Sequence, residues 1–451
     1  MTKRHGWLLR ALLVFALFLH YLRGNARRRY DLEKARRKRW HVASTPNDCT
    51  SVGGVARRLG RAVEEAMEES SRHQWGIHVT IPSKVSGLDQ DQQASFDVPH
   101  LLWVTNTTSV GDMESFFLAV FHANVGGDSE YTGQYQAIYV ARSNSIDSPG
   151  QVPSKWRVLS KLATRGSMGY LHWHPDGKQL FLAYELEDFL HGNTIAIRLY
   201  PSLQALITSS WYNEVQLKQR VKIWPWFFLP VPVVSVGTPT FSKVVVQDKK
   251  TTIYLRFYYY LWTDLPGTGI VNFQPPHDNQ QQQHVLKGYS WNAKQDDTVV
   301  TALRKLQVMG KIGQRATLQH PSDHSSSFLL FEGKMANADE QYIGWLSCRP
   351  ILYDASSQQA AIVPLALPQQ LQTFCNPTIT YIQGNDDYWA LSFFVPGEPF
   401  RDGLPETYAN YTPVEKCPTC AANPMQKAES PAKKGALLVM IKVDSVFPSP
   451  C

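Results

Sequence analysis

The sequence predicts an all-β protein, a five-bladed β-propeller with short helical insertions. Aromatic residues make up 12% of the 451 residues, and many stand in runs of alternating polarity such as residues 254–262. Such period-two runs are typical of strands. Five strand-like segments carry one pattern, apolar–Leu–any–apolar and one further residue, at residues 117–121, 181–185, 254–258, 328–332 and 390–394.

The five segments recur at a regular distance along the chain. Their last positions are 64, 73, 74 and 62 residues apart. A strand-rich unit repeated at this distance predicts repeated sheets, which bury their faces only against one another. Sheets of four strands arranged in a ring form a propeller, and each segment would be the second strand of one blade.

Apolar alternation assigns strands to each blade. Blade one is expected at residues 101–105, 116–122, 135–142 and 156–160, and blade two at 170–173, 180–185, 194–200 and 221–224, with a short helix at 202–207. Blade three is expected at 241–247, 253–262 and 270–273, followed by a helix at 297–309. Blade four follows at 316–319, 328–332, 343–349 and 361–365, and blade five at 378–382, 389–395 and 437–443. The first and last strands should lie near each other, because ring closure removes open sheet edges.

The chain is therefore expected to have three parts. Residues 1–39 are a signal or anchor segment plus a basic pro-segment, and residues 40–96 are an N-terminal extension with a helix at 55–69. Residues 97–451 form the propeller, with an insert at about 399–434 that is rich in Pro, Ala and Lys.

The N-terminus has the features of a targeting segment. Lys3 and Arg4 precede an apolar run at residues 11–22, small residues follow at 24–26, and Arg36-Arg37-Lys38-Arg39 resembles a processing site. The run has signal-sequence length and is short for a membrane span. We expect entry into the secretory pathway, as a secreted or a membrane-anchored protein. The alternative for the basic residues is a juxtamembrane stretch behind an uncleaved anchor.

The charge distribution argues against nucleic-acid binding. The formal charge is +7, but residues 1–39 hold twelve Lys or Arg against two acidic residues, so the rest of the chain is slightly negative. It has no surplus positive charge to neutralise phosphates.

The six cysteines suggest a few disulfides in an exported chain. Cys417 and Cys420 form a lone CxxC without further ligands at zinc-site spacing, so no metal ligands are assigned, and a local disulfide or two bridges to distant cysteines is expected instead. Asn106 and Asn410 begin glycosylation sequons. The sequence has no nucleotide-binding, zincin or serine-hydrolase motif and leaves the cofactor unknown.

A candidate site follows from the blade topology. In an antiparallel meander the end of the second strand lies beside the start of the first, so one rim of the ring should collect both sets of ends. The first-strand starts carry Asp97, Ser167, Thr238, Arg315 and Asn376, and the second-strand ends carry His122, Glu185, Tyr258, Glu332 and Phe394.

This set of residue types suits a sugar, because paired carboxylates supply acid and base for glycoside cleavage and aromatic faces stack on sugar rings. Glu185, Glu332 and Asp97 are the candidate catalytic residues. Arg315, His122, Tyr258, Trp173 and Asn376 are the candidate substrate-binding residues. Alternatively, the glutamates are solvated strand ends, Arg315 pairs with one of them or with a loop carbonyl, and His122 and Trp173 belong to the core.

Residues 97–445 resemble the five-bladed propeller glycosidases of the glycoside hydrolase family 43-like group, which includes arabinanases, xylosidases and arabinofuranosidases. The resemblance rests on short sequence motifs that occur in the same order. They are residues 181–185 followed by 192–195, Gly237-Thr238-Pro239-Thr240, Gly313-Gln314-Arg315, residues 328–333 followed by Trp345, and residues 374–377 before 393–394. It implies a glycosidase-like protein that acts on polysaccharide of the cell-wall type.

The sequence departs from the acidic triad of that group. Val236 precedes Gly237 where the resemblance implies a Glu acid, Ala316 follows Arg315 where relatives often have Asp, and residues 166–169 offer no Asp. Loss of a general acid typically lowers the rate by about 10²–10⁴. Two hypotheses therefore remain: a secreted glycoside hydrolase that uses Glu185 or Glu332, and a non-catalytic propeller that binds glycans or a protein.

Overall fold

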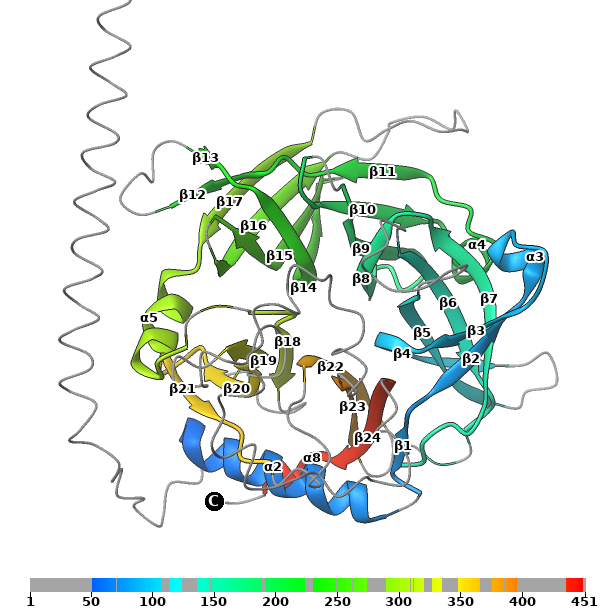
Figure 1. Cartoon of the computed structure of the whole chain (residues 1–451), viewed down its shortest axis with the longest axis horizontal. Coiled ribbons are helices and arrows are strands. Elements are labelled where there is room, and N and C mark those ends of the chain that lie inside the picture. Colours follow the sequence, from blue (N-terminus) through cyan, green and yellow to red (C-terminus); the bar gives the residue numbers. More distant parts are fainter. Residues whose placement is uncertain are drawn as a thin grey trace, which may run out of the picture. The chain divides into compact units, whose positions relative to one another are not determined.

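The protein is a five-bladed β-propeller (Figure 1). The computed structural model describes residues 51–69, 71–107, 113–123, 136–146, 148, 150–188, 191–223, 230–248, 250–261, 263–273, 289–308, 310, 312–319, 327–334, 348–365, 375–383, 387–395 and 435–448. Five sheets surround one axis, and their innermost strands are Asp97–Thr107, Gly166–Trp173, Ser235–Gln247, Ala316–Gln319 and Cys375–Ile382.

Blades one and two follow the expected order of strands. Blade one consists of β4 (Asp97–Thr107), β5 (Met113–Ala123), β6 (Ala137–Ser143) and β7 (Trp156–Ala163). Blade two consists of β8 (Gly166–Trp173), β9 (Leu180–Leu186), β10 (Thr194–Tyr200) and β11 (Asn213–Gln216), with α4 (Leu203–Ile207) between the last two. The outer strand of blade two is therefore not the expected segment at 221–224.

Blade three is larger than expected. Its four strands are β14 (Ser235–Gln247), β15 (Lys250–Tyr260), β16 (Asp264–Phe273) and β17 (Ser290–Gln295). Two further strands, β12 (Arg220–Lys222) and β13 (Pro230–Pro232), extend its outer edge, where β12 pairs in parallel with β17. The helix α5 (Asp297–Lys305) leads to blade four and begins with Asp296 as its N-cap.

Blade four consists of β18 (Ala316–Gln319), β19 (Ser327–Lys334), β20 (Cys348–Asp354) and β21 (Gln359–Ile362). Blade five consists of β22 (Cys375–Ile382), β23 (Tyr388–Val395), β24 (Gly435–Lys442) and β1 (His73–Trp75). Because β1 comes from the N-terminal side and pairs antiparallel with β24, the two ends of the propeller close the ring together. The segment expected as an N-terminal extension thus supplies a propeller strand.

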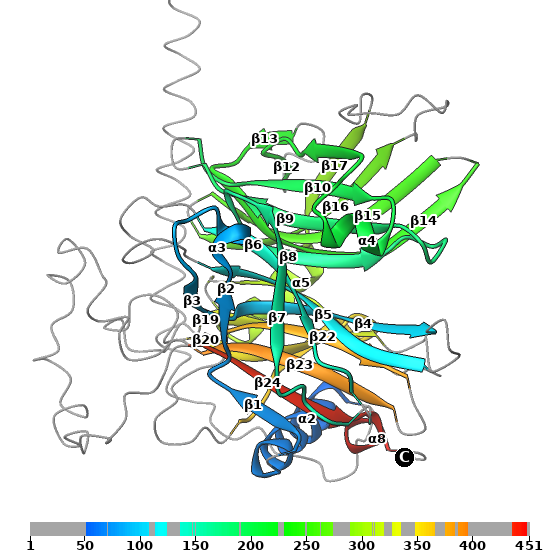
Figure 2. The same ribbon diagram turned by 90° about the vertical axis from the view of Figure 1, so that its right-hand side faces the viewer.

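The connection from β1 to blade one is the hairpin of β2 (His78–Ile81) and β3 (Gln92–Ser95), with the short helix α3 (Ser83–Ser86) between them. Figure 2 shows this segment running along the side of the ring next to β7.

One backbone irregularity repeats in four of the five inner strands. The pairing with the second strand shifts register next to Val98, Met168, Thr238 and Asn376, and these residues have positive φ between 43° and 50°. Non-glycine residues rarely adopt this conformation, and β-branched residues such as Val and Thr do so least. The strain therefore requires compensating contacts at this rim, where the candidate site lies.

Apolar clusters hold neighbouring blades together. They join blades one and two, two and three, four and five, and five and one. None of the clusters formed by described residues joins blades three and four; there, α5 packs on the free face of blade four.

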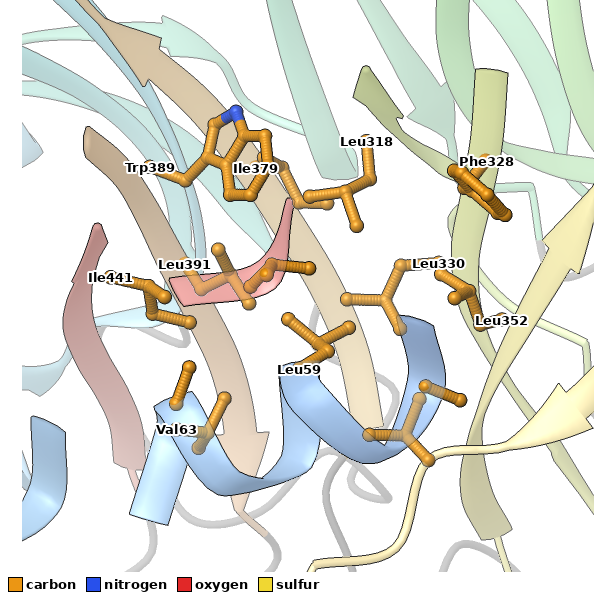
Figure 3. Packing of buried hydrophobic residues seen from close by; sticks show 14 of the residues in the cluster. Leu59, Val63, Leu318, Phe328, Leu330, Leu352, Ile379, Trp389, Leu391 and Ile441 are labelled. Atoms are coloured by element: carbon orange, nitrogen blue, oxygen red, sulfur yellow. The ribbon is translucent and has the colours of Figure 1, made fainter. Parts of the chain in front are cut away.

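The helix α2 (Val52–Glu68) packs against blades four and five, where it contacts β20, β21 and β24. Ser51 caps its first turn by accepting a hydrogen bond from the N–H of Gly54. Its apolar face, which includes Leu59 and Val63, packs on Leu330, Leu391 and their neighbours in the cluster of Figure 3. The C-terminal helix α8 (Val443–Val446) completes this cluster.

Several expectations fall on residues outside the described ranges, among them the segment 1–39, the insert at about 399–434 and the side chains of five cysteines. Cys375 is a buried thiol. Among the described helices, none is long and apolar enough to cross a membrane.

Candidate functional site

Glu185, at the end of β9, is buried and accepts three hydrogen bonds. The donors are the N–H of Thr238 (2.9 Å), Nδ2 of Asn193 (2.5 Å) and the hydroxyl of Tyr258 (3.0 Å). Thr238 and Tyr258 belong to blade three, so the carboxylate of Glu185 bridges two blades. Burial raises the pKa of Glu185, although the three donors act in the opposite direction.

Glu332, on β19, occupies the equivalent place in blade four. Its Oε2 accepts a hydrogen bond from the N–H of Asn376 in blade five (2.9 Å). The residue is 0% exposed. Burial raises its pKa to about 8, and the nearby carboxylate of Asp264 adds to this shift.

The two glutamates therefore make the same inter-blade contact. In each, the carboxylate at the end of a second strand accepts the N–H of the positive-φ residue in the next blade, Thr238 or Asn376. At the junction of blades five and one, the corresponding residues Phe394 and Val98 lie in one small apolar cluster. This repeat indicates that the position braces neighbouring blades.

The sequence did not single out Asp264. It begins β16 and pairs with Tyr260 in β15, beside the end of the second strand of blade three. Its charge raises the pKa of both Glu185 and Glu332, because like charges disfavour ionisation. Three carboxyl groups from blades two, three and four thus lie near one another, where the sequence predicted a pair.

Asp97 and His122 are opposite each other in blade one, as predicted for strand ends at one rim. Both are buried, and Asp97 accepts a hydrogen bond from the hydroxyl of Ser95 (2.5 Å).

Arg315 does not face the rim with the glutamates. Its guanidinium pairs with Asp296 (2.7 Å) and donates to the carbonyl oxygens of Phe257 (3.1 Å) and Gly267. These groups belong to blade three and to the N-cap of α5. The physical reason is burial, because a guanidinium that is 1% exposed must be paired and hydrogen-bonded, and these groups satisfy it.

Trp173 also lies away from the rim. It ends β8, opposite Leu180, whereas Ser167 pairs with Glu185 at the other end of the strand. Six residues of strand separate the two positions, a distance of about 20 Å. Trp173 packs against the core between blades one and two, in agreement with the alternative considered from the sequence.

Glu332 and Asn376 come together around Gly313. A Cβ on Gly313 would lie 1.8 Å from Oε1 of Glu332 and 2.4 Å from Oδ1 of Asn376. Both oxygens are buried and accept no hydrogen bond from any described residue. Two facing acceptors are stable side by side when one carries a proton, so a protonated Glu332 that donates to Asn376 agrees with its raised pKa.

We expect Gly313→Ala to destabilise the protein by about 1–3 kcal/mol, because the added methyl group would overlap a buried carboxyl group held by the next blade. Chemical denaturation measures the change. Gly53→Ala in α2 is the control, since its Cβ would meet only Arg57 at 3.8 Å and Ala favours a helix by about 0.5–1 kcal/mol. Equal stability of wild type and Gly313→Ala would show that Glu332 and Asn376 can separate.

No group of three or more His, Cys, Asp or Glu side chains in the described ranges is arranged to hold a metal ion. The three carboxyl groups of Glu185, Asp264 and Glu332 interact through their charges, and two of them are occupied by backbone N–H donors.

No protein-family model matches the chain, and neither does any curated protein sequence. Among solved structures, the chain is similar to an α-L-arabinofuranosidase from Lactobacillus brevis, with 11% identity, a TM-score of 0.34 and coverage of 62% of this chain and 84% of that one. A GH43_1 enzyme from Xanthomonas citri has 9% identity, a TM-score of 0.34 and coverage of 85% and 92%. An α-L-arabinanase from Cellvibrio cellulosa complexed with arabinohexaose has 9% identity, a TM-score of 0.33 and coverage of 67% and 88%.

These structures belong to the glycosidase group that the sequence resembles. At these scores and identities they carry no argument about chemistry. The five-bladed fold rests on the strand pairing of this chain, and the function must be argued from its own site.

Proposed function

We propose that the protein is a glycan-binding β-propeller that holds its ligand without hydrolysing it. The observation that carries this proposal is the engagement of Glu185 and Glu332, which accept the N–H groups of Thr238 and Asn376 in the next blades. They are 5% and 0% exposed. A general acid must come within hydrogen-bond reach of the glycosidic oxygen, and these carboxyl groups brace the ring instead.

The ligand class is argued from side chains on β15, the second strand of blade three. Tyr254 and Tyr260 of β15 are 37% and 39% exposed, and Arg256 between them is partly buried. Exposed aromatic rings and hydrogen-bonding groups on a rigid sheet suit the apolar faces and hydroxyls of a sugar. The resemblance of the sequence to the glycosidase group makes polysaccharides the first ligands to test.

The test is a parallel measurement of binding and hydrolysis with the full chain. Affinity electrophoresis and calorimetry against a panel of cell-wall polysaccharides measure binding, and release of reducing ends measures hydrolysis. We expect retention by at least one polysaccharide without release above the level of a heat-inactivated sample. Release of reducing ends from every polysaccharide that the protein binds contradicts the proposal. Binding to no polysaccharide of the panel contradicts it as well.

A second candidate function is glycoside hydrolysis with Glu332 as the acid. It is favoured by one observation, the pKa of about 8, which keeps this carboxyl group protonated at neutral pH as a general acid requires. Under this alternative Glu332→Gln abolishes reducing-sugar release and leaves binding intact. Under the binding proposal, there is no release to abolish.

We also propose that the protein enters the secretory pathway and reaches its mature form without residues 1–39. The support is the basic, apolar and small-residue order of residues 3–26 and the basic residues 36–39. N-terminal sequencing of protein from its native host tests this. A membrane-embedded chain that begins at Met1 or Thr2 means that the apolar run is an anchor.

A further inference from the structure

The boundary between blades three and four differs from the other blade junctions. The buried apolar clusters of the described residues join every other neighbouring pair of blades, but not this one. Charged side chains lie here instead, namely Arg256 of β15, Arg315 before β18 and Asp296 at the start of α5.

Arg315 and Asp296 neutralise each other. Their side chains form an ion pair at 2.7 Å, in which Arg315 is 0% exposed and Asp296 15%. The two other hydrogen bonds of Arg315 go to backbone carbonyls. The carboxylate of Asp296 is therefore already occupied and does not serve as the direct partner of another arginine.

Of the three charged side chains at this boundary, Arg256 is the one that is not part of the ion pair between Arg315 and Asp296. Its Nη1 donates to the hydroxyl of Thr317 in β18 (2.8 Å), and it forms no ion pair with any described residue. Its side chain is partly buried. Burial, followed by repulsion from Arg315, lowers its pKa to about 10. Buried charges in proteins are normally paired, and among the described residues this guanidinium has no anion of its own.

A tyrosine from a third blade lies near the same guanidinium. Tyr170 of β8 is 8% exposed and stacks on His100 of β4, with ring centroids 3.6 Å apart. Burial raises its pKa to about 12, and the positive charge of Arg256 opposes this shift. The hydroxyl of Tyr170 makes no hydrogen bond to a described residue.

We propose that Arg256, with the hydroxyls of Thr317 and Tyr170, binds the carboxylate of an acidic sugar. This inference rests on the proposed glycan-binding function and names the chemical class of the glycan. One uncompensated positive charge matches the single charge of a uronate, whereas a phosphate monoester carries about −1.5 to −2 at neutral pH and usually meets several cations. The guanidinium fork suits a planar carboxylate, and the two hydroxyls supply neutral partners for sugar oxygens.

The test is calorimetry on the full chain with trigalacturonate, neutral galactotriose and inorganic phosphate as separate ligands. We expect trigalacturonate to bind at least 10-fold more tightly than galactotriose. Arg256→Met should weaken trigalacturonate binding by about 10–100-fold, the usual effect of losing a charge-assisted hydrogen bond, and should leave galactotriose binding unchanged. Arg157→Met, which removes an exposed guanidinium from β7, is the matched control and should change neither affinity.

Arg256→Lys is the second variant, in case Arg256→Met unfolds, because lysine preserves the charge and lacks the planar guanidinium. A loss of trigalacturonate affinity that is smaller than the loss expected for Arg256→Met supports the site. Equal binding of both sugars, unaffected by either variant, overturns the acidic-sugar site and leaves glycan binding standing. Binding of phosphate alone, lost in Arg256→Met, overturns the sugar assignment. Binding of none of the three ligands contradicts this inference, while the polysaccharide panel decides the proposed function separately.

Discussion

Arg315→Met is expected to lower the free energy of unfolding by about 3–5 kcal/mol, the usual effect of breaking a buried ion pair by removing one partner. The methionine fills a similar volume but leaves the carboxylate of Asp296 without its cation and the carbonyls of Phe257 and Gly267 without a donor. No apolar cluster of described residues joins blades three and four, so these polar contacts are expected to contribute strongly to that junction. Urea denaturation followed by tryptophan fluorescence measures the change.

Two further variants separate charge from volume. Asp296→Asn in the Arg315→Met background removes the orphaned charge and keeps an N-cap for α5, so it should recover about 1 kcal/mol or more. Arg157→Met, on the exposed face of β7, should change stability by no more than about 0.5 kcal/mol. If Arg315→Met lowers the free energy of unfolding by less than about 1 kcal/mol, Arg315 does not stabilise the contact between the blades. It would then be available to a ligand, as the sequence suggested.

Most of the first and second strands of the blades could be predicted from the sequence because they are short apolar runs, which are typical of buried strands. Residues 316–319 coincide with β18, and residues 180–185 lie within β9. The outer strands could not be predicted as well. β17 and β11 are short and polar, and an outer strand needs one apolar face at most. β1 could not be assigned to blade five from local pattern, because its partner β24 lies more than 350 residues away.

The rim residues could be predicted in part for a geometric reason. Strand ends that face each other in a meander share a rim, and this rule correctly brought Glu185 to Tyr258 and Glu332 to Asn376. It did not account for the side chain of Arg315, which extends to Asp296 and to the carbonyl oxygens of Phe257 and Gly267 in blade three. It missed Asp264 because that residue begins a third strand, which the rule did not include.

Glu332→Gln is expected to stabilise the protein at pH 8 by at least about 2 kcal/mol and to leave it nearly unchanged at pH 5. In the native state burial raises the pKa of Glu332 from 4.5 to about 8, so the folded protein keeps a proton that the unfolded chain releases above pH 4.5. Between these values the folded state binds the extra proton, and the free energy of unfolding falls by up to about 1.4 kcal/mol per pH unit as pH rises. Glutamine resembles the protonated acid, since its amide can accept from the N–H of Asn376 and donate to Oδ1.

The measurement is urea denaturation of wild type and variant at pH 5, 6, 7 and 8. The difference between the two isolates Glu332 from other titrating groups, including Glu185, whose pKa burial also raises. Glu65→Gln on the exposed side of α2 is the control and should leave the pH profile of stability unchanged. A variant that is less stable than wild type at pH 8 would mean that Glu332 is ionised in the folded protein. The same profile bears on function, because the carboxyl group of Glu332 accepts the N–H of Asn376 in blade five, and a Glu332 that approaches a leaving group would have to open that contact.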